Sequence, residues 1–417
     1  MIPHTLYKEE FEVVIRIIFT FFGFPFANEI FVTMKNSILF LFLLSILGDS
    51  CSSAIPKVFG KKSAHEKHAD DLDKRDLDKT PAGRQWLAAS KTALELPQSI
   101  VLPYKQKGFF DNDKPRALGL KFMAIQGEKL SFTITKKNTS SFVLYVDLFK
   151  EDANGHSILH AADTASAPFS FDIEGSGNYV LRLQPQLFAT GEYTLSVSVG
   201  PSLLFPVVGK SAKTGSYWGA SRDGGKRSHE GIDIFAPKLT PVLAGADGII
   251  TGVGEGGIGG KVVWLHPVNK KYTLYYAHLD RQLVQEDQAV KKGDTLGLVG
   301  NTGNAKNTAA HLHFGIYGSS GAVDPFPFVN PAIKTAAAVP EKNLRTYLRL
   351  LKAQQLGNEM AKANTVMVPL AINIKGYIAE LPNGLQVQVP FTAVKAVPQT
   401  AKAEASVVRK TNEGNTF

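Results

Sequence analysis

Two short runs in the second half of the chain carry side chains that can hold a metal ion. The first run contains His229 and Asp233, and the second contains His311 and His313. Gly231 lies between the first pair and would permit a tight turn that brings them together. If the second run is a strand, its two imidazoles point to one face, because side chains alternate along a strand. The spacing therefore predicts one shared site.

Two neutral imidazoles and one carboxylate would make a three-ligand zinc site with the fourth position open. An open position suits hydrolysis, because Zn2+ can hold a water there and lower its pKa towards ~7. The two runs offer four candidates for three ligand positions, so one side chain is not needed as a ligand. Either His311 or His313 could bind the metal while the other acts as base or acid. A further imidazole, His278, lies in a strand-like run, and histidine titrates near neutrality, as acid–base catalysis requires. These residues predict hydrolysis with Zn2+ as the cofactor.

Three motifs, taken in order, resemble the lysostaphin/LytM-type zinc endopeptidases, which are peptidoglycan hydrolases. They are His-x-Gly-Ile-Asp at 229–233, Tyr-Ala-His-Leu at 276–279 and His-Leu-His-Phe at 311–314. The resemblance extends from about Gly215 to Phe328. It implies a zinc endopeptidase domain over this part of the chain.

The resemblance also assigns roles to individual residues. The zinc ligands that it implies are His229, Asp233 and His313. His278 and His311 would then flank the bound water and the carbonyl of the bond to be cut. Arg222, near the first ligand, becomes a candidate substrate contact, and a solvated loop arginine is the alternative for it.

A GxGxxG motif at 254–259 could suggest a nucleotide site. A dinucleotide-binding motif leads from a strand into a helix. Here the motif lies between two strand-like runs, 247–253 and 261–265. The sequence therefore predicts a glycine-rich hairpin loop and no nucleotide ligand.

Length and charge indicate the broad class of the protein. A chain of 417 residues with 44% hydrophobic residues is expected to form two or three globular domains. A formal net charge of +9 suits an anionic polymer such as a cell wall, but it would suit nucleic acid equally. Lys and Arg are scattered, and no nucleic-acid motif is recognisable, so no nucleic acid is expected as a partner.

The N-terminal part, residues 1–53, predicts export. One cysteine, Cys51, excludes an intrachain disulfide. It follows an apolar core at 38–47 that is too short to span a bilayer, so the segment is typical of a secretory signal. Cys51 is then the candidate lipid attachment of a membrane-anchored lipoprotein in the cell envelope. Cleavage just beyond it, releasing a soluble protein, is the alternative, and translation could start at Met34 instead of Met1.

Residues 54–97, the first part after the predicted signal, are expected to form a charged linker or helix. Within it, His65 and His68 are expected on a solvated helix and not as a metal pair. Short alternating strands separated by turn residues then predict a β-sandwich accessory domain over 98–201.

The zinc endopeptidase domain is predicted over 202–332, as a largely antiparallel β fold with an open groove for an extended peptide. Residues 340–363 are predicted to form a helix, because Leu344, Tyr347, Leu348 and Leu351 recur at helical spacing. A small SH3-like module would complete the 340–397 region, since 376–384 resembles a hairpin. Residues 398–417 are expected to form a loose tail.

The fold class is therefore mainly β, and the predicted function is zinc-dependent hydrolysis of peptide cross-links in bacterial peptidoglycan. Two alternatives are kept. One is a catalytically silent envelope scaffold that activates a partner cell-wall amidase. The other is a wall-binding adaptor that acts through its sandwich and SH3-like parts. A segment before the endopeptidase domain could also occlude its groove.

Overall fold

The computed structural model describes residues 62–137, 142–162 and 164–399, and it is mainly β with antiparallel sheets, as predicted. The predicted signal, Cys51, Met34 and most of the predicted tail lie outside these residues. Among the helices of the described residues, none is both long and apolar enough to span a bilayer.

Two capped helices occupy the segment that was predicted to be a charged linker or helix. Helix α3 (Ala64–Lys74) begins at a capping box, in which the Ser63 hydroxyl accepts from the Glu66 amide and the Glu66 side chain accepts from the Ser63 amide. Helix α4 (Pro81–Glu95) begins with Thr80 as its cap and a proline in its first turn. The helical alternative is therefore the observed one.

The expectation that His65 lies on a solvated helix is wrong. Its ring is 5% exposed and stacks on Trp86, with ring centroids 4.6 Å apart. Its Nε2 lies 2.6 Å from the Oε1 of Gln184. The charged pattern concealed this face, on which the rings of His65 and Trp86 pack beside a few aliphatic side chains such as Leu72.

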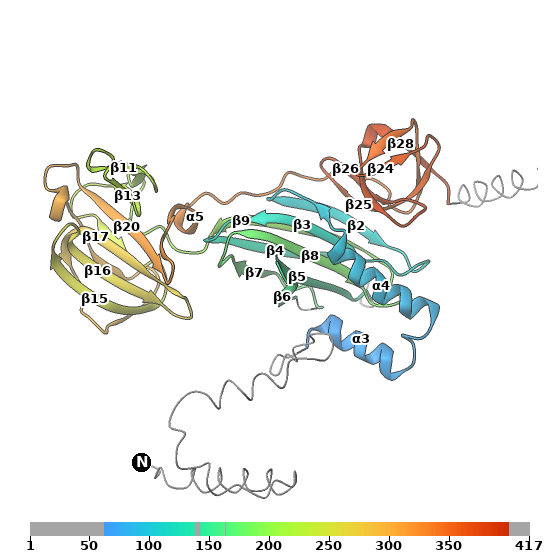
Figure 1. Ribbon diagram of the computed structural model, residues 1–417, viewed down its shortest axis with the longest axis horizontal. Helices are drawn as coiled ribbons and strands as arrows, with labels where there is room; N and C mark the ends of the chain where they lie inside the picture. Colours follow the sequence, from blue (N-terminus) through green and yellow to red (C-terminus); the bar gives the residue numbers. More distant parts are fainter. Residues whose placement is uncertain (1–61, 138–141, 163, 400–417) are drawn as a thin grey trace, which may run out of the picture. The chain divides into compact units, whose positions relative to one another are not determined.

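Two sheets share one core in the region predicted to be a β-sandwich (Figure 1). The strands of the first sheet are β1 (Gln98–Ser99), β3 (Leu118–Ala124), β5 (Leu144–Asp152), β6 (Gly155–Ala161) and β8 (Gly177–Pro185). Those of the second are β2 (Tyr104–Phe110), β4 (Glu128–Lys137), β7 (Phe169–Asp172) and β9 (Gly191–Pro201). Helix α4 packs on β3 and β8, so both faces of the first sheet are covered. On β5, Leu144 faces the core between the sheets and Tyr145 faces the helices.

The C-terminal part forms a small β module whose strands continue the second sheet. Its strands are β22 (Tyr347–Leu350), β23 (Gln354–Leu356), β24 (Glu359–Ala361), β25 (Val366–Asn373), β26 (Gly376–Glu380), β27 (Gln386–Val389) and β28 (Val394–Val397). Strand β25 pairs with β2, which gives the order β27–β26–β25–β2–β9–β4–β7. The hairpin predicted at 376–384 is β26 with the turn after it. Assignment of the module as SH3-like stays a prediction.

The helix predicted over 340–363 is wrong, because the described residues there contain short strands. Leu348 and Leu350 are buried while Tyr347 and Arg349 are half-buried, which is the two-residue period of a strand. Gly357 then turns the chain in the left-handed region, with a φ of 60°, between β23 and β24. The helical spacing of the leucines was therefore coincidental.

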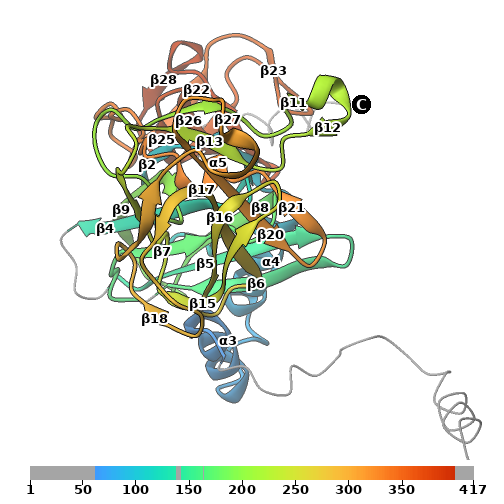
Figure 2. The ribbon, with the colours of Figure 1, turned by 90° about the vertical axis from the view of Figure 1, so that its left-hand side faces the viewer.

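The 202–332 domain is built on a third sheet (Figure 2). Its strands are β10 (Lys213–Ser216), β13 (Ile232–Phe235), β14 (Pro241–Leu243), β15 (Gly248–Gly256), β16 (Gly260–Pro267), β17 (Tyr272–Gln282), β18 (Ala289–Val290), β19 (Thr295–Val299), β20 (His311–Gly318) and β21 (Gly321–Val323). The main order is β10–β13–β20–β17–β16–β15–β18. One face of these strands packs into a core that includes Ile232, Tyr276 and Phe314, so the other face can carry a site.

The remaining short elements of the described residues lie between the strands of the third sheet, next to that sheet, or in the C-terminal module. They are β11 (Ser221–Arg222), β12 (Arg227–Ser228), α5 (Phe326–Val329) and the 3-10 turns η2 (Asp223–Gly225), η3 (Gly303–Ala305) and η4 (Phe391–Ala393). The GxGxxG motif lies at the hairpin between β15 and β16, where Gly256 pairs with Gly260. It therefore joins two antiparallel strands, as predicted, and does not lead into a helix.

Candidate metal centre and catalytic site

Sheet register brings the two metal-binding runs together. The second run is the start of strand β20, so His311 and His313 share a face. In the pairing of β13 with β20, Asp233 lies opposite His313, and in the pairing of β17 with β20, Ala277 lies opposite His313. The small side chain of Ala277 leaves room on that face. The two runs therefore meet because their strands are neighbours.

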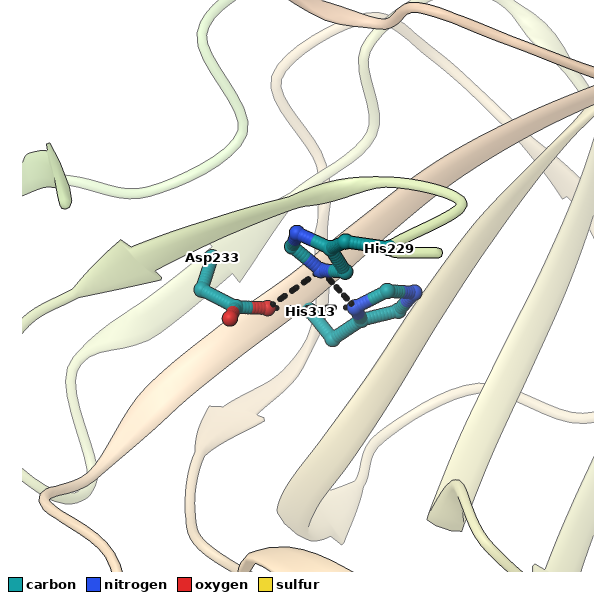
Figure 3. A group of neighbouring side chains, drawn as sticks. All are labelled: His229, Asp233 and His313. Atoms are coloured by element: carbon teal, nitrogen blue, oxygen red, sulfur yellow. Dashed lines mark hydrogen bonds and ion pairs between the residues drawn. The ribbon is translucent and has the colours of Figure 1, made fainter. Parts of the chain in front are cut away.

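Three ligand atoms form a nearly equilateral triangle (Figure 3). The Nε2 of His229 lies 3.0 Å from the Oδ1 of Asp233 and 3.0 Å from the Nδ1 of His313. The third side, from the Nδ1 of His313 to the Oδ1 of Asp233, is 3.1 Å. Donors at ~2.0–2.1 Å from a tetrahedral zinc lie about 3.3 Å apart, so this donor set fits that ion with a small expansion.

Protonation states at the triangle suit a metal. Burial alone would raise the pKa of Asp233, but hydrogen bonds with His229 and His313 hold that pKa well below its ordinary value. Burial lowers the pKa of His313. The carboxylate is therefore charged and the imidazole of His313 is neutral near pH 7, and these are the forms that bind metal ions.

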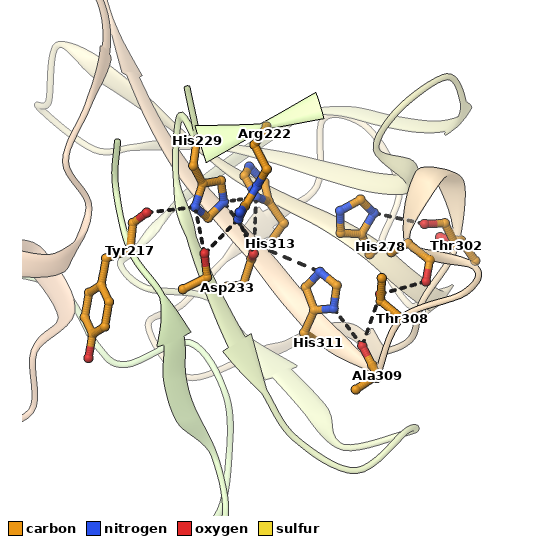
Figure 4. A network of polar contacts seen from close by, with 12 residues as sticks. Tyr217, Arg222, His229, Asp233, His278, Thr302, Thr308, Ala309, His311 and His313 are labelled. Atoms are coloured by element: carbon orange, nitrogen blue, oxygen red, sulfur yellow. Dashed lines mark hydrogen bonds and ion pairs between the residues drawn. The ribbon is translucent and has the colours of Figure 1, made fainter. Parts of the chain in front are cut away.

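Neighbouring groups orient two of these ligands (Figure 4). The Nδ1 of His229 lies 3.0 Å from the carbonyl oxygen of Tyr217, which leaves Nε2 to face the other ligands. Arg222 donates to the second oxygen of Asp233, Oδ2, at 2.6 Å and to the Oγ of Ser216 at 2.8 Å. Arg222 is therefore not the solvated loop side chain that the sequence left open, because its guanidinium holds the carboxylate.

His278 and His311 lie beside the triangle with their rings 5.0 Å apart. The Nδ1 of His278 lies 2.9 Å from the carbonyl oxygen of Thr302, and that of His311 lies 2.8 Å from the carbonyl oxygen of Ala309. A carbonyl can only accept, so each Nδ1 carries the proton and each Nε2 is left as an acceptor. Burial, with the charges of His311 and His313, lowers the pKa of His278 to about 4.

The backbone of His278 adopts an uncommon conformation. Its φ is 61°, in the left-handed region that non-glycine residues rarely adopt. Its amide donates to the carbonyl oxygen of Gly259 at 2.8 Å, so the β15–β16 hairpin holds it in place. Such strain costs on the order of 1–3 kcal/mol and concentrates at functional sites, which supports a functional reading of His278.

Gly231 has a different role from the one that the sequence suggested. Its φ is not in the left-handed region, so the turn does not require a glycine for its conformation. A Cβ at this position would lie 2.6 Å from the carbonyl oxygen of Phe314 and 2.7 Å from the His313 ring. Gly231 is therefore needed because the His313 ring packs directly against its backbone.

The candidate site opens into a cleft with a volume of about 610 Å3. All residues lining it come from 216–317, which is within the domain predicted over 202–332. The sequence reasoning missed the carbonyl partners of the histidines, which have no side-chain signal. It also missed three aromatic residues of the lining, Trp264, Tyr275 and Tyr317. Alternation of Tyr275 with Ala277 on β17 and of Tyr317 with His313 on β20 could have indicated the two tyrosines.

Comparison with known proteins points to the same part of the chain. The model of Peptidase family M23 matches residues 227–325. An L-Ala--D-Glu endopeptidase of Bacillus subtilis is 35% identical over 124 residues, which cover 27% of this chain and 38% of that protein. The peptidoglycan DD-endopeptidase ShyC of Vibrio cholerae is 36% identical over 88 residues, which cover 21% of this chain and 20% of that protein.

A solved structure, the catalytic domain of the antimicrobial peptidase lysostaphin from Staphylococcus simulans, is 33% identical. The match covers 28% of this chain and 92% of the lysostaphin chain, with a TM-score of 0.27. This chain thus spans well under half the length of the two curated relatives named above, and the match to the family model lies within the domain that holds both metal-binding runs. The chain contains a domain of peptidase family M23.

Proposed function

We propose that this protein is a zinc-dependent endopeptidase that hydrolyses peptide cross-links in bacterial peptidoglycan. The observation that carries the proposal is the triangle of His229, Asp233 and His313, with sides of 3.0–3.1 Å, beside two imidazoles whose Nε2 atoms are free to accept. The names of the two curated relatives support the reaction class. An open cleft along the sheet suits an extended peptide.

Within this proposal, each residue of the chain has a defined task. A zinc ion held by the triangle would supply a Lewis acid with an open position. His311 accepts the proton of the attacking water at Nε2 and then donates that proton to the leaving amine, while neutral His278 accepts at its own Nε2 and orients the water. Asp233 is the one anionic ligand, so the site stays net positive and favours the oxyanion that forms at the attacked carbonyl.

Peptidoglycan lies outside the cytoplasmic membrane, so this function requires export. The signal predicted in residues 1–53 would supply it, and lipid attachment at Cys51 would hold the protein at the membrane. A silent scaffold that activates an amidase is not favoured, because the structure brings all five candidate ligand and catalytic residues together. Labelling with a radioactive fatty acid in cells, compared between the natural chain and Cys51→Ser, tests the anchor.

The activity is tested with the purified full chain and intact peptidoglycan, with and without a chelator, followed by mass spectrometry of the released fragments. We expect new amine termini at cross-links, abolished by the chelator and restored by zinc. His278→Ala should keep its zinc and lose most turnover, whereas Asp233→Ala should lose zinc. A folded, zinc-loaded chain that releases no fragment from walls of several cross-link types would overturn the proposal.

A further inference from the structure

The cleft floor continues from the metal triangle onto three aromatic rings, which we call the aromatic corner: Trp264, Tyr275 and Tyr317. Tyr275 pairs with Gly315 on β20 and with Trp264 on β16, so these positions form one row across the sheet. That row lies two residues beyond His313, or about 7 Å along the strand. The corner thus borders the metal triangle, within reach of a long substrate side chain close to the bond at the metal.

The three rings contact one another but do not form a flat surface. The centroid of Trp264 lies 4.2 Å from that of Tyr275 and 5.5 Å from that of Tyr317, with ring planes at 35° and 55°. Tyr275 and Tyr317 lie 5.9 Å apart at 80°. Stacking of a sugar requires a flat face, whereas a compact cation needs only the exposed face of one ring within about 6 Å of its centroid. The geometry therefore favours a cation over a glycan ring.

Gly315 allows this arrangement. A Cβ on Gly315 would lie 2.9 Å from the Tyr317 ring and 3.4 Å from the carbonyl oxygen of Glu230. The Tyr317 ring therefore lies back across its own strand towards the metal triangle, in space that only glycine leaves open. Tyr275 also contacts the ligand His313, with ring centroids 6.0 Å apart.

A carboxylate accompanies the rings. Glu230, which follows the ligand His229, is exposed and lines the same cleft. The Tyr317 ring and the backbone of Glu230 both border the space at Gly315, and the charge of Glu230 adds to the burial that raises the pKa of Tyr317 to about 12. Arg227 also lies near Glu230, but its guanidinium is paired with Asp223 at 2.6 Å. Glu230 is therefore available to a positive group in the aromatic corner.

We infer that the aromatic corner and Glu230 bind the free ammonium group of a diamino-acid residue next to the bond that is cleaved. This inference rests on the proposed function and names its substrate class. The rings attract the cation through their faces, and the carboxylate balances its charge. Together they should favour a free amine over its neutral acetylated form by about tenfold in kcat/KM.

The test uses the zinc-loaded full chain and two sugar-free cross-linked peptides that differ only in a free or acetylated side-chain amine. We expect kcat/KM to be about tenfold higher for the free amine. In Trp264→Leu and Glu230→Gln, the ratio of the two values should fall to about threefold or less. Phe235→Leu, at the other end of the cleft, is the matched control and should keep the ratio of the natural chain.

Binding separates this inference from the proposed function. Calorimetric titration of the same two peptides into zinc-loaded His311→Ala needs no cleavage. A preference for the free amine there supports the aromatic corner even if no peptide is cut. Equal binding and equal kcat/KM for the two peptides would overturn the inference, although cleavage persists. A preference that requires attached glycan instead of the amine would also overturn it.

Discussion

Arg222 and Asp233 form the contact on which the metal ligands most depend. The carboxylate uses Oδ1 towards the two ligand imidazoles and Oδ2 towards Arg222, at 2.6 Å. A side chain that is bound on both oxygens has one orientation, and a ligand fixed in this way loses little freedom when it binds a metal. In the proposed zinc site, the arginine would therefore act on the metal through Asp233.

We predict that Arg222→Met weakens zinc binding by about 10–100-fold, because Asp233 loses the group that orients it. The zinc Kd is measured by competition with a chromophoric chelator. Ser216→Ala removes the other hydrogen-bond partner of the guanidinium and should have a smaller effect. An unchanged Kd in Arg222→Met together with a raised KM would instead make Arg222 the substrate contact that the sequence suggested.

For single residues, the sequence predicted which residues form the site better than it predicted which atom of each side chain faces the metal position. The spacing indicated a metal site but left His311 and His313 as alternatives, and the resemblance implied His229, Asp233 and His313, which the structure brings together. That His229 uses Nε2 while His313 uses Nδ1 depends on strand register and ring packing, which have no local signature. The tautomers of His278 and His311 depend on backbone carbonyls, which every residue has.

Strand alternation was the most informative signal for whole elements. The short alternating strands predicted over 98–201 correspond to strands of the sandwich such as β4, β8 and β9. The pairing of β25 with β2 could not be predicted, because Gly108 and Ala371 are far apart in the sequence. Such a pair is selected by burial in a shared core, as Ala371 and Ile378 show.

That shared core predicts that the C-terminal module stabilises the sandwich. Ile378→Ala should reduce the free energy of unfolding by about 2–5 kcal/mol, because Ile378 is 1% exposed in the sandwich core. Hydrogen exchange should show faster exchange of the amides of β2 and β9. Ile374→Ala, at a position that is 64% exposed on the same module, is the control and should change stability by less than about 0.5 kcal/mol. Faster exchange confined to β25, β26 and β27 would contradict the prediction.

At the scale of the molecule, the helix layer links the stability of the sandwich to pH. Burial and the positive charge of Arg182 lower the pKa of His65 to about 3, although its hydrogen bond with Gln184 opposes the shift. In the unfolded chain the same imidazole titrates near 6.5. Between these values the unfolded chain binds more protons, so the stability that neutral His65 contributes is complete above about pH 6.5 and is lost as pH falls towards about 3.

We therefore predict that the calorimetric transition of the sandwich moves to lower temperature between pH 7.5 and pH 5, and that His65→Gln flattens this dependence. Glutamine can keep a hydrogen bond to Gln184 but has no proton to gain, so the variant isolates the titration from the packing. His266→Gln, at an exposed position on β16, is the matched control and should keep the slope of the natural chain. An equal slope in His65→Gln would show that the acid sensitivity arises in other groups, such as His160, whose pKa burial also lowers.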